Sequence, residues 1–158
     1  MELDRLREQN RWWDGEDALD ADFHLRAVAE APFAIAHPAE RRIDLTRDRV
    51  YILRGPRQVG KTTILKKLIK RLITSKRVDP RSILYFAFDI AGLRDAAEVK
   101  DGVVSYINWA RSVCLDKNRL WIFLDEVTYT PDWAVWIKSV YNLGILHGCL
   151  PCCLLLFF

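Results

Sequence analysis

The sequence contains no apolar run near the roughly 20 residues that a membrane-spanning helix needs. Its longest apolar stretch lies in the C-terminal "CLPCCLLLFF", which is far too short. The N-terminal "MELDRLREQN" is charged and has no apolar core, so it does not resemble a secretory signal. Internal repeats and low-complexity segments are also missing. These absences predict a cytoplasmic protein with no membrane partner.

A strong charge of one sign is absent as well. The chain has 24 Lys and Arg against 21 Asp and Glu, and its formal net charge is +3 at pH 7. This balance is too mild to indicate a nucleic-acid partner by itself. A length of 158 residues with 51% hydrophobic and 28% charged residues suits one folded domain with a buried core.

Cysteine is scarce outside the C-terminal segment "HGCLPCC", which holds Cys149, Cys152 and Cys153 beside His147. A zinc cluster or a redox Cys-x-x-C can be imagined there. Structural zinc sites, however, usually take ligand pairs from two separate segments, whereas these residues lie in one short piece. We interpret the cysteines as apolar residues and expect reduced thiols inside a cell.

Apolar strands and amphipathic helices alternate after residue 48. Continuous apolar runs predict buried strands at 49–54, 82–89 and 120–126, and helical spacing predicts helices after residue 63, within 92–114 and from Asp132 to Gly144. This order predicts an α/β fold with a parallel sheet covered by helices on both faces. Before residue 49 we expect a short helix, a second helix capped by Asp20 or Asp22, and a short strand in "RIDLT".

The stretch "LRGPRQVGKTT", residues 53–63, has the pattern of a phosphate-binding loop between a strand and a helix. The two glycines let the backbone bend around a phosphate with its N–H groups inward, and the following helix adds its positive N-terminal end. Lys61 is placed to reach the β- and γ-phosphates. The residues predicted to hold the nucleotide are Gly55, Pro56, Arg57, Gln58, Val59, Gly60, Lys61, Thr62 and Thr63.

The apolar run "LWIFLDE" ends in Asp125 and Glu126, at the edge where open α/β sheets bind ligands. We expect Asp125 and the hydroxyl of Thr62 to serve Mg²⁺. Glu126 would polarise the water that attacks the γ-phosphate, so Glu126 and Lys61 are the predicted catalytic residues.

Other residues have open or unremarkable roles at this level. Asp89 could order metal or water, or cap a turn, and Arg57 could contact phosphate, a neighbouring subunit or only solvent. Trp133 and Trp136 are expected in the core. The basic helix face is expected to be solvated; its residues are Lys66, Lys67, Lys70 and Arg71.

The sequence resembles the P-loop ATPases of the AAA+ class, over about residues 10–147. The resemblance is carried by "RGPRQVGKTT", "LYFAFD", "IFLDEVTYTPDWAVWIKSVYNLGIL" and "NRWWDG", and it points to an archaeal and bacterial branch. It implies a three-layer ASCE-type sandwich, with the Walker A strand in the middle of the sheet and the Walker B strand near it. It also implies ATP and Mg²⁺ as cofactors, with the loop, Thr62, Asp125 and Glu126 in the roles given above.

The C-terminal segment departs from that family. Its members insert a further strand between the Walker A and Walker B strands, and that strand ends in a polar sensor residue. At the corresponding place this chain has "HGCLPCCLLLFF", which does not end in a polar residue. We therefore expect C-terminal truncation near residue 149, with no last strand, sensor or arginine finger. The expected domains are an N-terminal segment (1–48), a partial ATPase core (49–147) and an aberrant apolar tail (148–158).

Mg²⁺-dependent ATP hydrolysis is the expected function. A nucleotide-binding module without catalysis and a P-loop kinase are the alternatives, and phosphate transfer to a second substrate would distinguish the kinase. The resemblance allows a homo-oligomer or a protein or DNA partner, without identifying one.

Overall fold

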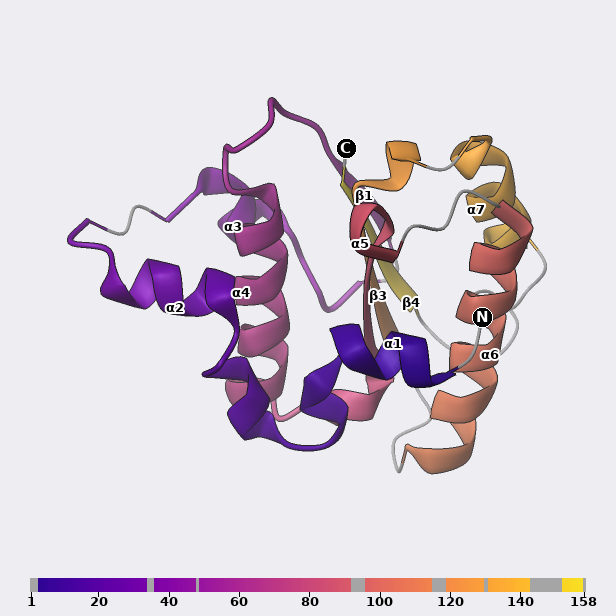
Figure 1. Cartoon of the computed structure of the whole chain (residues 1–158), viewed down its shortest axis with the longest axis horizontal. Helices are drawn as coiled ribbons and strands as arrows, with labels where there is room; N and C mark the ends of the chain where they lie inside the picture. Colours follow the sequence, from indigo (N-terminus) through magenta and orange to yellow (C-terminus); the bar gives the residue numbers. More distant parts are fainter. Residues whose placement is uncertain are drawn as a thin grey trace.

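In the part of the chain that the structure describes, four parallel strands form one sheet with helices on both faces (Figure 1). Helices α2 (Phe23–Glu30), α3 (Pro38–Arg42) and α4 (Lys61–Thr74) lie on one side of the sheet, and α6 (Ala96–Val113) and α7 (Trp133–Asn142) lie on the other. The predicted α/β class with a parallel sheet is therefore confirmed. The computed structural model describes residues 3–33, 36–47, 49–91, 96–114, 119–129, 131–142 and 152–157.

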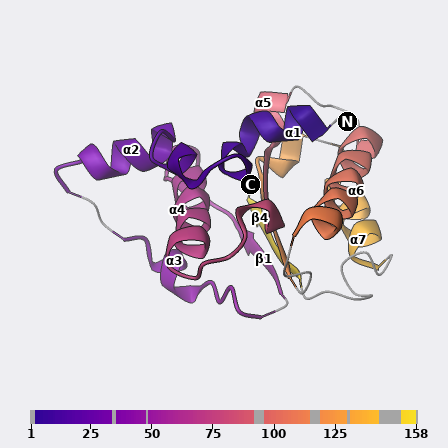
Figure 2. The same ribbon diagram turned by 90° about the horizontal axis from the view of Figure 1, so that it is seen from below.

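The order of the strands in the sheet is β1-β4-β3-β2. Residue Ile122 of β3 is opposite Leu154 of β4, and Tyr51 of β1 is opposite Leu155 of β4. A view turned by 90° shows the sheet between the two helical layers (Figure 2). The strand bounds are β1 Val50–Leu53, β2 Ile83–Ala87, β3 Leu120–Asp125 and β4 Cys152–Phe157.

The expectation that the last strand is missing is wrong. Residues Cys152–Phe157 form β4, which pairs with β1 on one side and with β3 on the other. A run of six apolar residues suits an interior strand of a parallel sheet, because both faces of such a strand are covered. The strand begins after Pro151, so the missing N–H of proline removes no hydrogen bond from within β4.

Strand β1 differs from expectation in its position and its burial. Within the described part of the chain it is an edge strand, whereas the resemblance implied a central one. Val50 is 39% exposed and Ile52 is 53% exposed, so the run predicted to be fully buried is only half covered. Val50 and Ile52 share one face of the strand, and that face is exposed, whereas Tyr51 and Leu53 on the other face are partly buried.

The predicted central elements are present with small shifts of their ends. Strand β2 is buried along its whole length, as expected, but stops at Ala87 because residues 88–91 turn into a short helix. The predicted inner side of the 92–114 helix is confirmed, since Val103, Ile107 and Ala110 are buried. The bounds are α4 Lys61–Thr74, α5 Phe88–Ala91, α6 Ala96–Val113 and α7 Trp133–Asn142, with 3₁₀ turns η3 Pro80–Ser82 and η4 Val127–Tyr129.

The N-terminal region is more helical than its sequence suggested. The carboxylate of Asp22 caps α2 by accepting hydrogen bonds from the N–H groups of His24 (2.9 Å) and Leu25 (3.2 Å). The strand predicted in "RIDLT" does not form; α3 ends there, although Ile43 and Leu45 are buried. The bounds are α1 Leu3–Gln9, η1 Arg11–Trp13, η2 Glu16–Leu19, α2 Phe23–Glu30 and α3 Pro38–Arg42.

The N-terminal residues also cover the outer edge of β2. The indole N–H of Trp13 donates to the carbonyl of Ile83 at 2.8 Å, and the N–H of Ala87 donates to the side-chain oxygen of Gln9 at 2.8 Å. Between them, the Asn10 amide bonds both backbone groups of Tyr85. These contacts satisfy alternate backbone groups of an edge that would otherwise be open for pairing.

The predicted domain boundaries themselves stay predictions.

The basic face of α4 is only partly solvated, contrary to expectation, and three of its lysines are paired with acids. Lys66 is only 6% exposed and forms an ion pair with Asp22 at 3.3 Å. Lys67 pairs with Glu40 at 3.1 Å, and Lys70 pairs with Asp20 at 2.9 Å. Helices α2 and α3 pack on α4. Glu40 lies in α3, Asp22 caps α2, and Asp20 follows η2. Among the described residues, every helix is too short or too polar to traverse a lipid bilayer.

Candidate active site

The loop between β1 and α4 has the backbone conformation of a tight turn. Gly60, the residue before α4, has φ +86°, which a side chain would strain. Gln58 has φ +63° despite its side chain. Such backbone outliers cluster at functional sites. The first turn of α4 leaves N–H groups without partners inside the helix, and these can bind an anion.

Lys61 begins α4 and turns back over the loop. Its ammonium group donates to the carbonyl of Gly55 at 3.1 Å and to that of Pro56 at 2.7 Å. The residue is 7% exposed, although loop residues 54–59 are exposed. The charge is thus fixed at the concave side of the loop, where a phosphate oxygen could exchange with the carbonyls.

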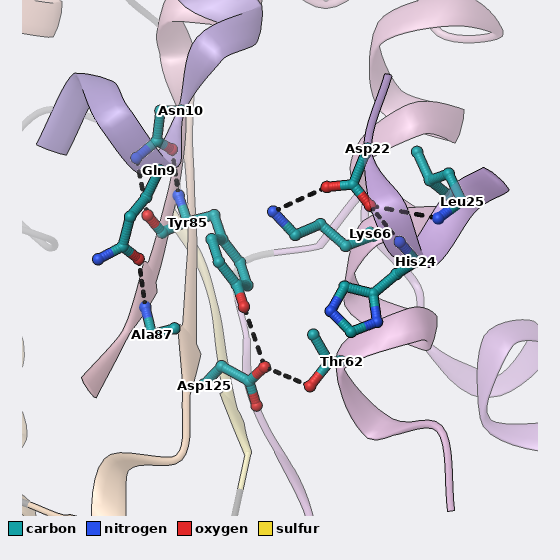
Figure 3. Close-up of polar contacts among 10 residues, drawn as sticks. All are labelled: Gln9, Asn10, Asp22, His24, Leu25, Thr62, Lys66, Tyr85, Ala87 and Asp125. Carbon is teal, nitrogen blue, oxygen red and sulfur yellow. Dashed lines mark hydrogen bonds and ion pairs between the residues drawn. The ribbon is translucent and has the colours of Figure 1, made fainter. Parts of the chain in front are cut away.

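Thr62 and Asp125 are brought together by the fold. The hydroxyl of Thr62 donates to Oδ2 of Asp125 at 2.7 Å, across a gap of 63 residues in the sequence. Thr62 lies in the first turn of α4, and Asp125 is the last residue of β3. The two residues predicted to serve a metal are therefore direct neighbours (Figure 3).

Within the described ranges, the carboxylate of Asp125 has one oxygen without a hydrogen bond. The residue is 2% exposed, and its Oδ1 has no hydrogen-bond partner among the described residues. A buried carboxylate oxygen without a partner is costly, and such groups are rare. A hard cation or one of its water ligands would satisfy it, and Mg²⁺ takes oxygen ligands of this kind. The residues present therefore fit a magnesium ion beside Thr62.

Glu126 follows Asp125 and has φ +53°, in the left-handed region. The chain turns sharply there, and the N–H of Tyr129 donates to the carbonyl of Glu126 at 3.1 Å. A non-glycine residue in this conformation costs of order 1 kcal/mol. The turn thus begins directly after Asp125, the last residue of β3.

Tyr85 is a site residue that the sequence analysis missed. Its hydroxyl donates to the same Oδ2 of Asp125 at 3.1 Å. Burial raises the pKa of this phenol far above its usual range, and the charge of Asp125 raises it further. Tyr85 therefore stays protonated and acts as a hydrogen-bond donor at ordinary pH.

Lys66 lies over the ring of Tyr85. Its ammonium nitrogen is 3.7 Å from the centroid of that ring and 5.0 Å from the ring of Trp12, a cation–π arrangement. Burial lowers the pKa of Lys66, while the ion pair with Asp22 opposes that shift. A pocket of about 580 Å³ lies beside this group, and Trp12, Asp22, Lys66 and Tyr85 contribute to its walls.

A sequence signal for Lys66 did exist. Lys66 falls at helical spacing with Ile69 and Ile73, both fully buried, so it continues the apolar stripe of α4 rather than the opposite face. No comparable signal marks Tyr85, because it lies inside a strand that is apolar throughout.

The remaining predicted residues lie outside this cluster or outside the described part. Arg57 is exposed in the loop, and Asp89 is exposed in α5 rather than at the end of a strand. Trp133 packs against the core, as expected. The side chain of Trp136, the predicted helix end at Gly144, and the segment with His147 and Cys149 lie outside the described residues.

The fold and the site together define a nucleotide-binding protein of the P-loop type, with a strand–loop–helix cradle facing a strand that ends in a carboxylate. A family model described as "AAA domain" matches residues 47–149. The chain therefore belongs to this family of AAA-type ATPases, which implies a nucleotide-binding, ATPase-like function. Among curated proteins and among solved structures, no match is found.

Proposed function

We propose that this chain binds ATP together with Mg²⁺ and hydrolyses it to ADP and phosphate. The observation that carries the proposal is the 2.7 Å contact between Thr62 and Asp125, next to the buried Oδ1 of the same carboxylate, which has no partner in the described part of the chain. A phosphate-binding loop by itself would be satisfied by any anion. The oxygens of Thr62 and Asp125, in contrast, would be satisfied by a cation beside them. ATP with Mg²⁺ supplies both charges.

Each residue of the site has a distinct task in this proposal. The backbone of Gly55 to Thr63 wraps the phosphates, and Lys61 exchanges its bonds to the loop carbonyls for bonds to phosphate oxygens. Thr62 and Asp125 hold the ion, which neutralises charge that develops on the phosphates. Glu126 accepts a hydrogen bond from the attacking water and orients it.

The first test is thermal unfolding with and without Mg-ATP. A ligand at 100 times its Kd should stabilise the protein by about 2.7 kcal/mol, which raises Tm by roughly 5–10 °C. Lys61→Ala should abolish this shift, because the phosphates lose their main counter-charge. Lys76→Ala removes an exposed lysine just beyond α4 and serves as the matched control. An equal shift in Lys61→Ala and wild type would contradict the proposed cradle.

The second test is phosphate release from ATP by the purified chain. Release into water supports hydrolysis, transfer to an acceptor would instead indicate a kinase, and binding without turnover would indicate a nucleotide-binding module.

A further inference from the structure

We propose that Tyr85 is the positioning residue of the magnesium site: its hydroxyl holds the Asp125 carboxylate in the orientation that leaves Oδ1 for the cation. This inference rests on the proposed function. Oδ2 of Asp125 accepts two hydrogen bonds, from Thr62 at 2.7 Å and from Tyr85 at 3.1 Å. The donors come from α4 and β2, on different sides of the carboxylate (Figure 3). Two donors on one oxygen fix the carboxylate torsion, and Oδ1 is left without a partner among the described residues.

Tyr85 is itself held at its backbone. The Asn10 side chain is fully buried; it donates to the Tyr85 carbonyl at 2.8 Å and accepts from the Tyr85 N–H at 2.6 Å. A third bond, to the carbonyl of Leu6 at 2.7 Å, fixes the amide in turn. The backbone that carries the phenol therefore cannot shift without breaking buried hydrogen bonds.

The ring of Tyr85 is held by Lys66. The ammonium nitrogen lies 3.7 Å from the ring centroid, and Asp22 keeps it there through a 3.3 Å ion pair. A cation on the ring face also draws electron density from the phenol and so makes its O–H a better donor. Backbone, ring and hydroxyl are thus each fixed by a different partner, as expected of the outer support of a metal ligand.

The hydrogen bond from Thr62 alone would not fix the orientation of the Asp125 carboxylate. Once a cation is bound, the Thr62 oxygen must also serve as a ligand, so its position follows the ion. The Tyr85 hydroxyl has Asp125 as its partner and needs no contact with the ion, so it keeps the carboxylate in place whether or not the ion is present.

The test is Tyr85→Phe, which removes one oxygen and keeps the ring. Binding of AMP-PNP is measured by calorimetry in excess Mg²⁺ and again in EDTA, and the ratio of the two affinities gives the gain due to magnesium. Tyr85→Phe should reduce this gain about tenfold, while affinity in EDTA changes less than about twofold. Tyr106→Phe is the matched control, because Tyr106 is also fully buried and its hydroxyl donates to the carbonyl of Arg81 at 3.2 Å, away from the site.

Three results would overturn the inference: an unchanged magnesium gain in Tyr85→Phe, equal losses in both phenylalanine variants, or a loss in EDTA as large as the loss in Mg²⁺. A wild-type protein that gains nothing from Mg²⁺ would instead refute the proposed function and the inference with it. If Tyr85→Phe shows no cooperative thermal unfolding, the same measurement is made on Lys66→Met. It removes the cation from the ring face and should reduce the magnesium gain about threefold; an unchanged gain would again overturn the inference.

Discussion

The hydroxyl of Thr62 donates to the carboxylate of Asp125 at 2.7 Å, although 63 residues separate them in the sequence. The first belongs to the opening turn of α4, and the second ends β3. Parallel strands place their carboxyl ends, and the helix N-termini that follow, at one edge of the sheet. The contact is thus a direct product of the fold, and it brings the two predicted metal ligands together.

Removing the charge of Asp125 should abolish the effect of Mg²⁺ on nucleotide binding without destabilising the fold. Asp125→Asn keeps the shape but removes the charge that attracts Mg²⁺, so AMP-PNP should bind equally in Mg²⁺ and in EDTA. The free protein should become more stable by about 1 kcal/mol, because a buried charge is removed. Calorimetry and thermal unfolding measure the two effects. Asp101→Asn, at an exposed position of α6, should change neither, and a strongly destabilised Asp125→Asn would contradict this account.

Removing the Glu126 carboxylate should stop turnover and leave nucleotide binding intact. Without a group to orient the attacking water, phosphate release by Glu126→Gln should fall by at least about 100-fold. AMP-PNP affinity in Mg²⁺ should stay within about twofold, because the phosphates are held by the loop. Glu30→Gln makes the same chemical change at an exposed surface pair and should be silent. Undiminished turnover in Glu126→Gln would show that another residue orients the attacking water.

Asn10 should be important for stability, although it lies far from the loop in the sequence. Asn10→Ala deletes three buried hydrogen bonds and leaves both backbone groups of Tyr85 without partners. We expect a loss of about 3 kcal/mol, which lowers Tm by roughly 6–12 °C. Asn108→Ala on the exposed side of α6 should cost less than about 0.5 kcal/mol. Equal effects of the two substitutions would show that the edge of β2 does not need Asn10.

Two of the three acid–lysine pairs on α4, Asp22 with Lys66 and Asp20 with Lys70, should differ sharply in strength. Asp22→Ala removes the cap of α2 and leaves the buried ammonium group of Lys66 without its carboxylate, which should cost about 3 kcal/mol. Asp20→Ala breaks the exposed pair with Lys70 and should cost less than about 1 kcal/mol. Denaturant unfolding of both variants measures the difference. Similar midpoints would mean that the Asp22 pair is no better shielded from water than the surface pair.

Much of the fold and part of the site were predictable, because their signals are local. The loop from Gly55 to Thr63 and the strand ending in Asp125 and Glu126 are short patterns, each bounded by an apolar strand or helix. Helical spacing located α4 and α6 for the same reason. By contrast, the prediction for "RIDLT" failed, since two alternating apolar residues can be buried without a strand partner.

The sequence by itself determined the glycine-rich loop, the two carboxylates at the end of β3 and the alternation of strands and helices, because each depends on neighbours a few residues apart. Only the tertiary structure decided that residues 152–157 enter the sheet between β1 and β3. It alone also decided that Asn10, Lys66 and Tyr85 converge behind Asp125. Those contacts join segments up to 75 residues apart. Which polar groups pair in the interior depends on which ones the packed layers bring close together. A sequence pattern of a few residues does not contain that information.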